Sequence, residues 1–173
     1  TDFITAGQGQ GTVEYYGDTR TITTPRTFYS VEVNMDAGKV LTLLANHTLN
    51  GNLTVVNGTF SINDAAATTA LAITVKGDVV VAASGKIATG KANARHQLNL
   101  YGNFTNSGEV CFTNRTAASY IAEATDGIVD VNFLNTAASQ SVLCKGLTNF
   151  YRIEVDKGTD NTFTLNLDAT APA

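Results

Sequence analysis

The sequence is poor in the residues that mark several common protein classes. Its 173 residues include 2 Cys, 2 Pro, 1 Met and no Trp, and only 15% are charged, against about 25% in an average globular domain. Two cysteines are too few for a small secreted domain held together by disulfides. Cys111 and Cys144 both lie in apolar, strand-like segments. We therefore expect two free, buried thiols that pack as small apolar groups, with a single disulfide as the alternative.

Charge and hydropathy argue against two further classes. The net charge is −4 and the basic residues form no cluster, which argues against a nucleic-acid partner. No apolar run approaches the roughly 18 residues of a membrane span.

The chain begins within a strand-like sequence pattern and stops soon after a strand-like segment. We therefore expect residues 1–173 to form a single segment of a longer, repetitive protein.

The residues that are present favour β-structure. Apolar residues make up 43% of the chain, and polarity comes mainly from 26 Thr, 16 Asn and 15 Gly. Apolar and polar residues alternate with a period of two in segments 31–33, 71–75, 98–100 and 153–155, as in half-buried strands. The short Ala-rich segments 64–71 and 117–124 are interpreted as loops or single turns. The composition is typical of an all-β, extracellular protein.

Glycine spacing reveals a repeat. One glycine recurs before a strand-like segment at nearly equal intervals, at Gly51, Gly77, Gly102 and Gly127. A second glycine follows in the first three units, at Gly58, Gly85 and Gly108. Each unit therefore reads as strand, glycine turn, strand, wider loop and strand. Glycine suits such corners because it adopts left-handed backbone conformations without a Cβ penalty.

A second sequence repeat, with a longer separation, is superimposed on the glycine repeat. Residues 27–33 resemble residues 149–155, and residues 11–16 resemble residues 127–132. The separation of the first pair is close to five of the shorter units, so both repeats fit one continuous stack. A fixed period of this length is typical of solenoids and related arrays. We predict a parallel β-solenoid, or β-helix, of about seven coils with a period of about 25 residues, with an antiparallel β-sandwich as the alternative.

The repeats also resemble those of a known group of proteins. Segments 11–17, 52–55, 98–108 and 150–155 are similar to the repeats of large surface proteins of Bacteroidota, many of them gliding-motility or adhesin-like proteins exported by the type IX system. The resemblance implies a β-helical stalk or adhesin segment at the bacterial cell surface. It carries over no catalytic residue.

Few side chains are grouped as catalytic or metal-binding residues would be. His47 and His96 each lie before a strand-like segment, two repeat units apart. Two coils would separate them by about 10 Å, too far to share a metal ion, so we expect surface or hydrogen-bonding histidines. Asp156 and Asp160 flank Gly158 in an oxygen-rich segment. We interpret this segment as a polar turn, with a calcium site as the less favoured alternative.

Aromatic residues offer the remaining candidate site. Tyr15, Tyr29, Tyr101 and Tyr151 recur at repeat-related positions, where exposed rings could bind sugars. The competing interpretation is packing, with Phe in the core and the adjacent Tyr half-exposed, because neighbouring strand residues point to opposite faces.

The leading functional hypothesis is a non-enzymatic structural or adhesive segment of a secreted or cell-surface protein, acting as a rigid stalk. We expect no cofactor, no metal and no catalytic residue. The expected partners are surface glycans or other cell-surface or secretion proteins. One alternative is a carbohydrate-binding module that uses the four tyrosines, and another is a polysaccharide-active β-helix enzyme.

Overall fold

The computed structural model describes residues 10–63, 69–89, 94–113, 127–160 and 162–169. All secondary structure in these residues is β, with no helix among them, and it forms one 11-stranded sheet and one 6-stranded sheet. The predicted all-β class is confirmed. The Ala-rich segments at 64–71 and 117–124 lie partly or wholly outside the described residues.

The strands form three rows, two of them in the larger sheet. The first row contains β1 (Thr12–Gly17), β4 (Ser30–Met35), β7 (Leu53–Ile62), β9 (Val79–Thr89), β11 (Phe104–Asn106), β14 (Gln140–Cys144) and β17 (Leu165–Asp168). The second row contains β2 (Arg20–Ile22), β5 (Val40–Leu43), the later parts of β7 and β9, β12 (Glu109–Cys111) and β15 (Leu147–Asn149). The third row is the smaller sheet, with β3 (Arg26–Phe28), β6 (His47–Leu49), β8 (Ala72–Val75), β10 (Arg95–Leu100), β13 (Ile128–Phe133) and β16 (Arg152–Val155).

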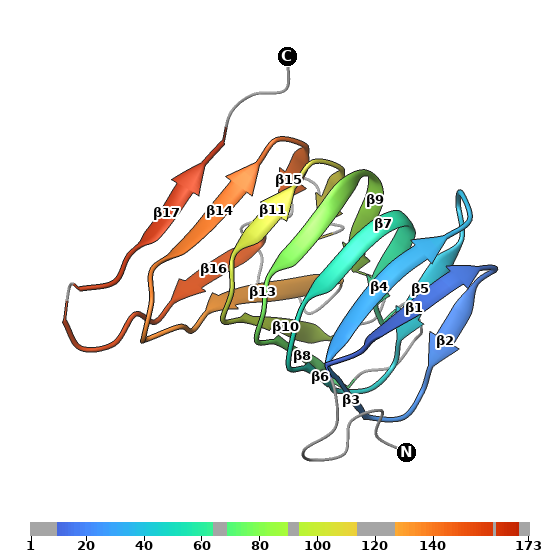
Figure 1. Ribbon diagram of the computed structural model, residues 1–173, viewed down its shortest axis with the longest axis horizontal. Coiled ribbons are helices and arrows are strands. Elements are labelled where there is room, and N and C mark those ends of the chain that lie inside the picture. Colours follow the sequence, from blue (N-terminus) through green and yellow to red (C-terminus); the bar gives the residue numbers. More distant parts are fainter. Residues whose placement is uncertain (1–9, 64–68, 90–93, 114–126, 161, 170–173) are drawn as a thin grey trace.

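Pairing within the three rows is parallel throughout the described strands. The one antiparallel contact recorded outside the named strands is an isolated bridge between Thr113 and Ile128. The alternative of an antiparallel sandwich is therefore wrong for this part of the chain. Figure 1 shows the first row across the front of the molecule, with β1 and β17 at its opposite ends and the third row behind it.

The chain visits the three rows in a repeating order. β4, β5 and β6 lie in the first, second and third rows in turn, and β11 to β13 and β14 to β16 follow the same order. β7 and β9 are long enough to pass through the first two rows before the chain enters β8 and β10. This order matches the predicted unit of strand, glycine turn, strand, loop and strand.

The steps between register partners are nearly equal only in the middle of the chain. Leu53 pairs with Val79 and Val79 with Phe104, which are steps of similar length along the sequence. The step from β1 to β4 is clearly shorter, and the step from β11 to β14 is clearly longer. A single fixed period is therefore not confirmed for the whole chain, because the connections between strands differ in length.

Three of the sequence matches join strands that lie in different rows, and one of them, 11–16 with 127–132, equates β1 of the first row with β13 of the third. Gly127 precedes β13 in the third row, whereas Gly51, Gly77 and Gly102 precede first-row strands. The match of 27–33 with 149–155 likewise equates β4 of the first row with β16 of the third. The fourth glycine position and both longer matches are thus wrong as structural equivalences, since similar strand sequences serve more than one row.

The core lies between the rows. Inward residues alternate along each strand with outward ones, as the pleat of a strand requires, and most are fully buried Val, Leu, Ile and Phe. Phe112 stacks on Phe150 with ring centroids 5.7 Å apart, and Phe104 lies within 6.3 Å of both rings. Apolar side chains from successive strands therefore pack on one another along the rows.

Candidate functional site

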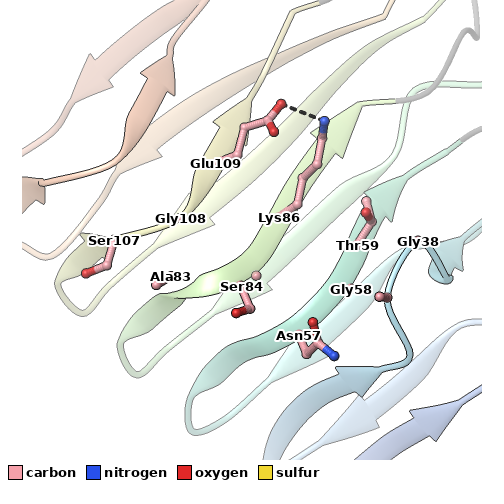
Figure 2. Close-up of a pocket in the computed structure, with 12 residues that line it drawn as sticks. Gly38, Asn57, Gly58, Thr59, Ala83, Ser84, Lys86, Ser107, Gly108 and Glu109 are labelled. Carbon is pink, nitrogen blue, oxygen red and sulfur yellow. Dashed lines mark hydrogen bonds and ion pairs between the residues drawn. The ribbon is translucent and has the colours of Figure 1, made fainter. Parts of the chain in front are cut away.

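An open groove of about 490 Å³ follows the bend between the first and second rows. Three polar–Gly–X triplets line it, one from each of three neighbouring strand positions, as Figure 2 shows. The triplets are Asn57-Gly58-Thr59, Ser84-Gly85-Lys86 and Ser107-Gly108-Glu109, and Ala37 and Gly38 close one end. The groove therefore runs across the strands.

A row of glycines forms the floor of the groove. Gly58 and Gly85 are register partners, and Gly58 has φ of +73°, a conformation that favours glycine. A Cβ atom on Gly85 would lie 2.2 Å from the carbonyl oxygen of Val55, and one on Gly108 would lie 2.2 Å from that of Gly85. Side chains are excluded here because the backbones of successive strands approach too closely. Gly58 and Gly85 are themselves buried, so the glycines serve the close stacking of successive strands at this bend.

Charged and hydroxyl side chains stand on the second-row side of the groove. Thr59 pairs in register with Lys86, and Lys86 with Glu109. The Lys86 ammonium donates to Glu109 Oε1 at 2.6 Å, and both side chains are about 40% exposed. Hydroxyls and one ion pair together offer donors and acceptors to an extended polar chain. Such a surface suits hydrogen-bonded recognition.

The four predicted tyrosines do not form one platform. Tyr15 is half-buried and packs edge-on against Phe28 at 6.4 Å, and burial raises the pKa of its hydroxyl. Tyr151 lies under the Arg95 guanidinium, 5.7 Å from the ring centroid. Tyr15 is thus a packing residue, and Tyr16 beside it is the exposed aromatic, at 70%.

Tyr29 and Tyr101 occupy the same corner but are not neighbours. Tyr29 follows Phe28, the last residue of β3, and Tyr101 follows Leu100, the last residue of β10. Phe28 and Leu100 share a register position, with Leu49 of β6 and Val75 of β8 between them. The positions between them are occupied by Asn50 and Lys76, whose amides bond to the preceding strands. A sugar that stacked on one ring would therefore meet an amide or an ammonium, not a second ring.

The paired aromatic segments follow the packing interpretation. Phe28 is buried and Tyr29 half-buried, while Phe150 packs against the core beside a half-buried Tyr151. The expectation of Phe inside and Tyr half-exposed is confirmed at Phe28 and Tyr29, whereas Phe150 is itself only partly buried.

Both histidines lie in the core, so the expectation of surface histidines is wrong. His47 is 2% exposed and His96 is fully buried. β8 separates their strands, as the two-coil prediction requires, but His47 shares a register position with Leu98 and not with His96. His96 Nδ1 accepts the amide of Leu71 at 3.0 Å, which confirms a hydrogen-bonding role for this residue. Burial lowers the pKa of both rings, that of His47 to about 4.

The acidic segment and the thiols match the simpler expectations. Asp156 Oδ1 accepts the amide of Gly158, and Asp160 Oδ1 accepts the amide of Thr162. Hydrogen bonds from Thr162 lower the pKa of Asp160. Both carboxylates therefore act as turn acceptors.

Cys111 and Cys144 are free thiols, as expected, but they are half-buried, whereas full burial was expected. Within the described residues no group of three His, Cys, Asp or Glu side chains could hold a metal ion.

Two polar clusters in the fold were not predicted from the sequence. Asp130 is 2% exposed and pairs with Arg95 at 2.6 Å and Arg152 at 3.2 Å, which joins β10, β13 and β16. Lys157 is buried and donates to the Asn135 carbonyl at 3.2 Å and to Gln140, and burial lowers its pKa. The partners lie far apart in the sequence and at unequal separations, so no local motif marks them. The groove could have been predicted from the sequence, because the second glycine of each repeat unit has polar residues on both sides.

Comparison of the chain with protein-family models, with curated proteins and with solved structures finds no match. No helix in the described part of the chain is long and apolar enough to cross a membrane.

Proposed function

We propose that this chain is a segment of a parallel β-helix of about seven coils, in which each full coil passes once through each of the three rows. The support is the repeated order of first, second and third row together with parallel pairing inside each row. A chain that returns to the same row in the same direction, after passing through two others, winds around a common axis. The predicted period then applies to the central coils, and the outer coils differ in loop length.

The segment acts as a non-enzymatic stalk or adhesive element of a secreted or cell-surface protein, as the resemblance to type IX-exported Bacteroidota proteins implies. The observation that carries this proposal is the unbroken parallel path of seven strands from β1 to β17. In such an array each unit is stabilised by its neighbours. A continuous ladder of this kind resists bending and holds whatever is attached to its ends apart.

Distance measurements between the ends of the row test the stalk. Glu14 and Asp168 are exposed and occupy the same register position on β1 and β17, six strand spacings apart. Spin labels at Glu14→Cys and Asp168→Cys, in a chain with Cys111→Ser and Cys144→Ser, should give one narrow distance distribution. Its backbone centre should lie at about 29 Å, from a strand spacing of about 4.8 Å. A broad or multimodal distribution would exclude a rigid stalk.

Location requires a separate test. Intact producing cells are treated with a protease, and the released peptides are identified by mass spectrometry. Peptides from the chain should appear before those of cytoplasmic proteins. Release only after lysis would refute the cell-surface assignment without affecting the distance measurement.

Carbohydrate binding is the second candidate, and the groove favours it more than the tyrosines do. Polar groups repeat across three neighbouring strand positions along the groove, which suits an extended hydrophilic chain. A glycan array probed with the wild type, Lys86→Ala and Tyr101→Ala distinguishes the two surfaces. Binding lost only in Lys86→Ala supports the groove, binding lost only in Tyr101→Ala supports the tyrosine hypothesis, and an array without signal refutes both. The polysaccharide-active alternative stays a prediction, and among the described residues no group of three His, Cys, Asp or Glu side chains could hold a metal ion for it.

A further inference from the structure

His47 occupies an unusual position for an ionisable side chain. It opens β6 in the third row, is 2% exposed, and lies in register between Arg26 of β3 and Ile73 of β8. Neither of its ring nitrogens makes a hydrogen bond of good geometry, although the backbone of Arg26 is close enough to favour the protonated ring. Its ring lies 6.1 Å from that of Phe28. A neutral imidazole is tolerated in such surroundings, whereas a charged one loses its hydration and gains only the Arg26 backbone in return.

The spaces around the ring contain little that could stabilise a positive charge. On the inner side is an apolar pocket, in which Tyr15 is the one other titratable residue. On the outer side is a hollow of about 330 Å³, in which Arg26 is the one other charged residue. No carboxylate is present among the residues that line either space. Arg26 is itself a cation, so protonation of His47 would place two like charges side by side.

His96 provides an internal contrast. It is also buried, on β10, and its Nε2 likewise has no partner, but its Nδ1 accepts the Leu71 amide at 3.0 Å. The hydrogen bond fixes one tautomer and ties the ring to the preceding strand. His47 has no corresponding bond, and it lies in the second strand of its row, close to the end. Local opening requires fewer contacts to break at an end of an array than in its middle.

We propose that His47 is an acid-sensitive switch within the fold, whose protonation separates β3 from β6 and loosens the N-terminal strands while the central strands remain paired. Burial is the largest cause that lowers the pKa of His47, to about 4 from 6.5, and it outweighs the opposing effect of the Arg26 backbone. The open and unfolded states bind the proton below pH 6.5, and the closed state resists it down to about pH 4. The closed state is therefore fully favoured above pH 6.5, loses stability as the pH falls from 6.5 to 4, and loses no more below that range.

The proposal predicts a specific difference between two proteins. Wild type and His47→Phe, which keeps an aromatic ring and removes the titration, are compared by urea unfolding from pH 7.5 to 4. Their carboxylates are the same, so these cancel in the difference. Between pH 7 and pH 4.5 the unfolding equilibrium constant of the wild type should rise about tenfold or more relative to that of His47→Phe. Equal pH dependence in the two proteins would overturn the proposal.

Two further measurements keep the test decisive. If His47→Phe does not fold, His47→Gln replaces it, because an amide also lacks the titration. In the wild type, NMR titration of the two imidazoles should place His47 well below 6.5, and a value near 6.5 in the folded protein would overturn the proposal. Amide exchange at pH 5, corrected for its intrinsic rate, should increase more in β3 and β6, at the end of the row, than in β10. Equal increases in all three strands would indicate general acid unfolding and would contradict a local switch.

Discussion

At the scale of single residues, several glycines occupy positions where the structure leaves no space for a side chain. Gly51, Gly77 and Gly102 succeed one another at the corner between the third and first rows, where a Cβ atom on Gly77 would lie 2.8 Å from the carbonyl oxygen of Gly51. Gly58, Gly85 and Gly108 do the same at the bend of the groove. Two rows of glycine thus allow successive backbones to approach within hydrogen-bonding distance at two corners of the fold.

Substitution at Gly85 tests this constraint. Its Cβ position lies 2.2 Å from a backbone oxygen, which cannot rotate away as a flexible side chain could. Gly85→Ala should therefore lower the free energy of unfolding by roughly 2 kcal/mol or more, by analogy with overpacked cores. The control is Gly11→Ala, at a glycine with no atom within 4 Å of its Cβ position. Urea denaturation measures both, and equal stability of the two variants would contradict a close-packed corner.

At the scale of strands, side-chain amides and carboxylates connect one strand position to the next. Asn52 Oδ1 accepts the Asp78 amide at 2.9 Å, Asp78 Oδ1 accepts the Asn103 amide at 2.7 Å, and Asn103 Oδ1 accepts the Ser141 amide at 2.9 Å. Ser30 Oγ begins the series by accepting the Asn52 amide at 3.0 Å. This polar ladder bonds backbone amides just before β7, β9 and β11 begin and at the second residue of β14.

Asp78 is the informative member of the ladder, since it accepts from both the amide and the side chain of Asn103. Asp78→Ala should cost about 1 to 2 kcal/mol of unfolding free energy, the usual contribution of such hydrogen bonds. Asp78→Asn keeps an oxygen acceptor and should retain most of the stability. Thermal denaturation of the two variants measures the difference. If Asn destabilises as much as Ala, then charge and not hydrogen bonding is what the position supplies.

The third row is joined differently, through the buried Asp130 between Arg95 and Arg152. Asp130→Asn should lower the unfolding free energy by about 3 kcal/mol, because it leaves two guanidinium groups without their shared anion. Glu154→Gln is the control, since Glu154 pairs with Arg152 while more than half exposed, and exposed pairs contribute at most about 1 kcal/mol. Chemical denaturation checks both variants, and a loss under about 1 kcal/mol for Asp130→Asn would contradict the assigned role.

Sequence predicted the class of strand pairing and the unit of three strands, because alternation and glycine corners are local signals. It did not predict which row a strand joins. Gly127 resembles the corner glycines yet opens a third-row strand, since glycine ends strands in any row. The long step between β11 and β14 breaks the period, and long connections are tolerated at little entropic cost. His47 is buried because it pairs in register with Ile73 of β8. That pairing joins residues far apart in the chain, so no local sequence pattern predicts it.

At the scale of the whole molecule, burial is greatest in the middle of the rows. Inward residues of β7, β8, β9 and β10 are fully enclosed, with Leu53, Ile73, Val79 and Leu98 all at 0% exposure. Towards the C-terminal end, Leu147, Val155 and Leu167 are 50% exposed or more. The strands that carry them, β15, β16 and β17, each have one paired neighbour among the described strands. Stability should therefore fall from the middle of the rows towards the ends.

Amide hydrogen exchange on the 173-residue chain measures this gradient. Amides in β7 to β10 exchange only when strands on both sides separate, whereas those in β15 to β17 exchange when one strand leaves the end of its row. At pH 7, protection in the central strands should exceed that in the last three by at least about a hundredfold, which corresponds to roughly 3 kcal/mol of opening free energy. The N-terminal strands should be intermediate at this pH, because His47 is then neutral. Uniform protection along the chain would mean that the strands open together as one cooperative unit, and the ends could not then respond separately to acid.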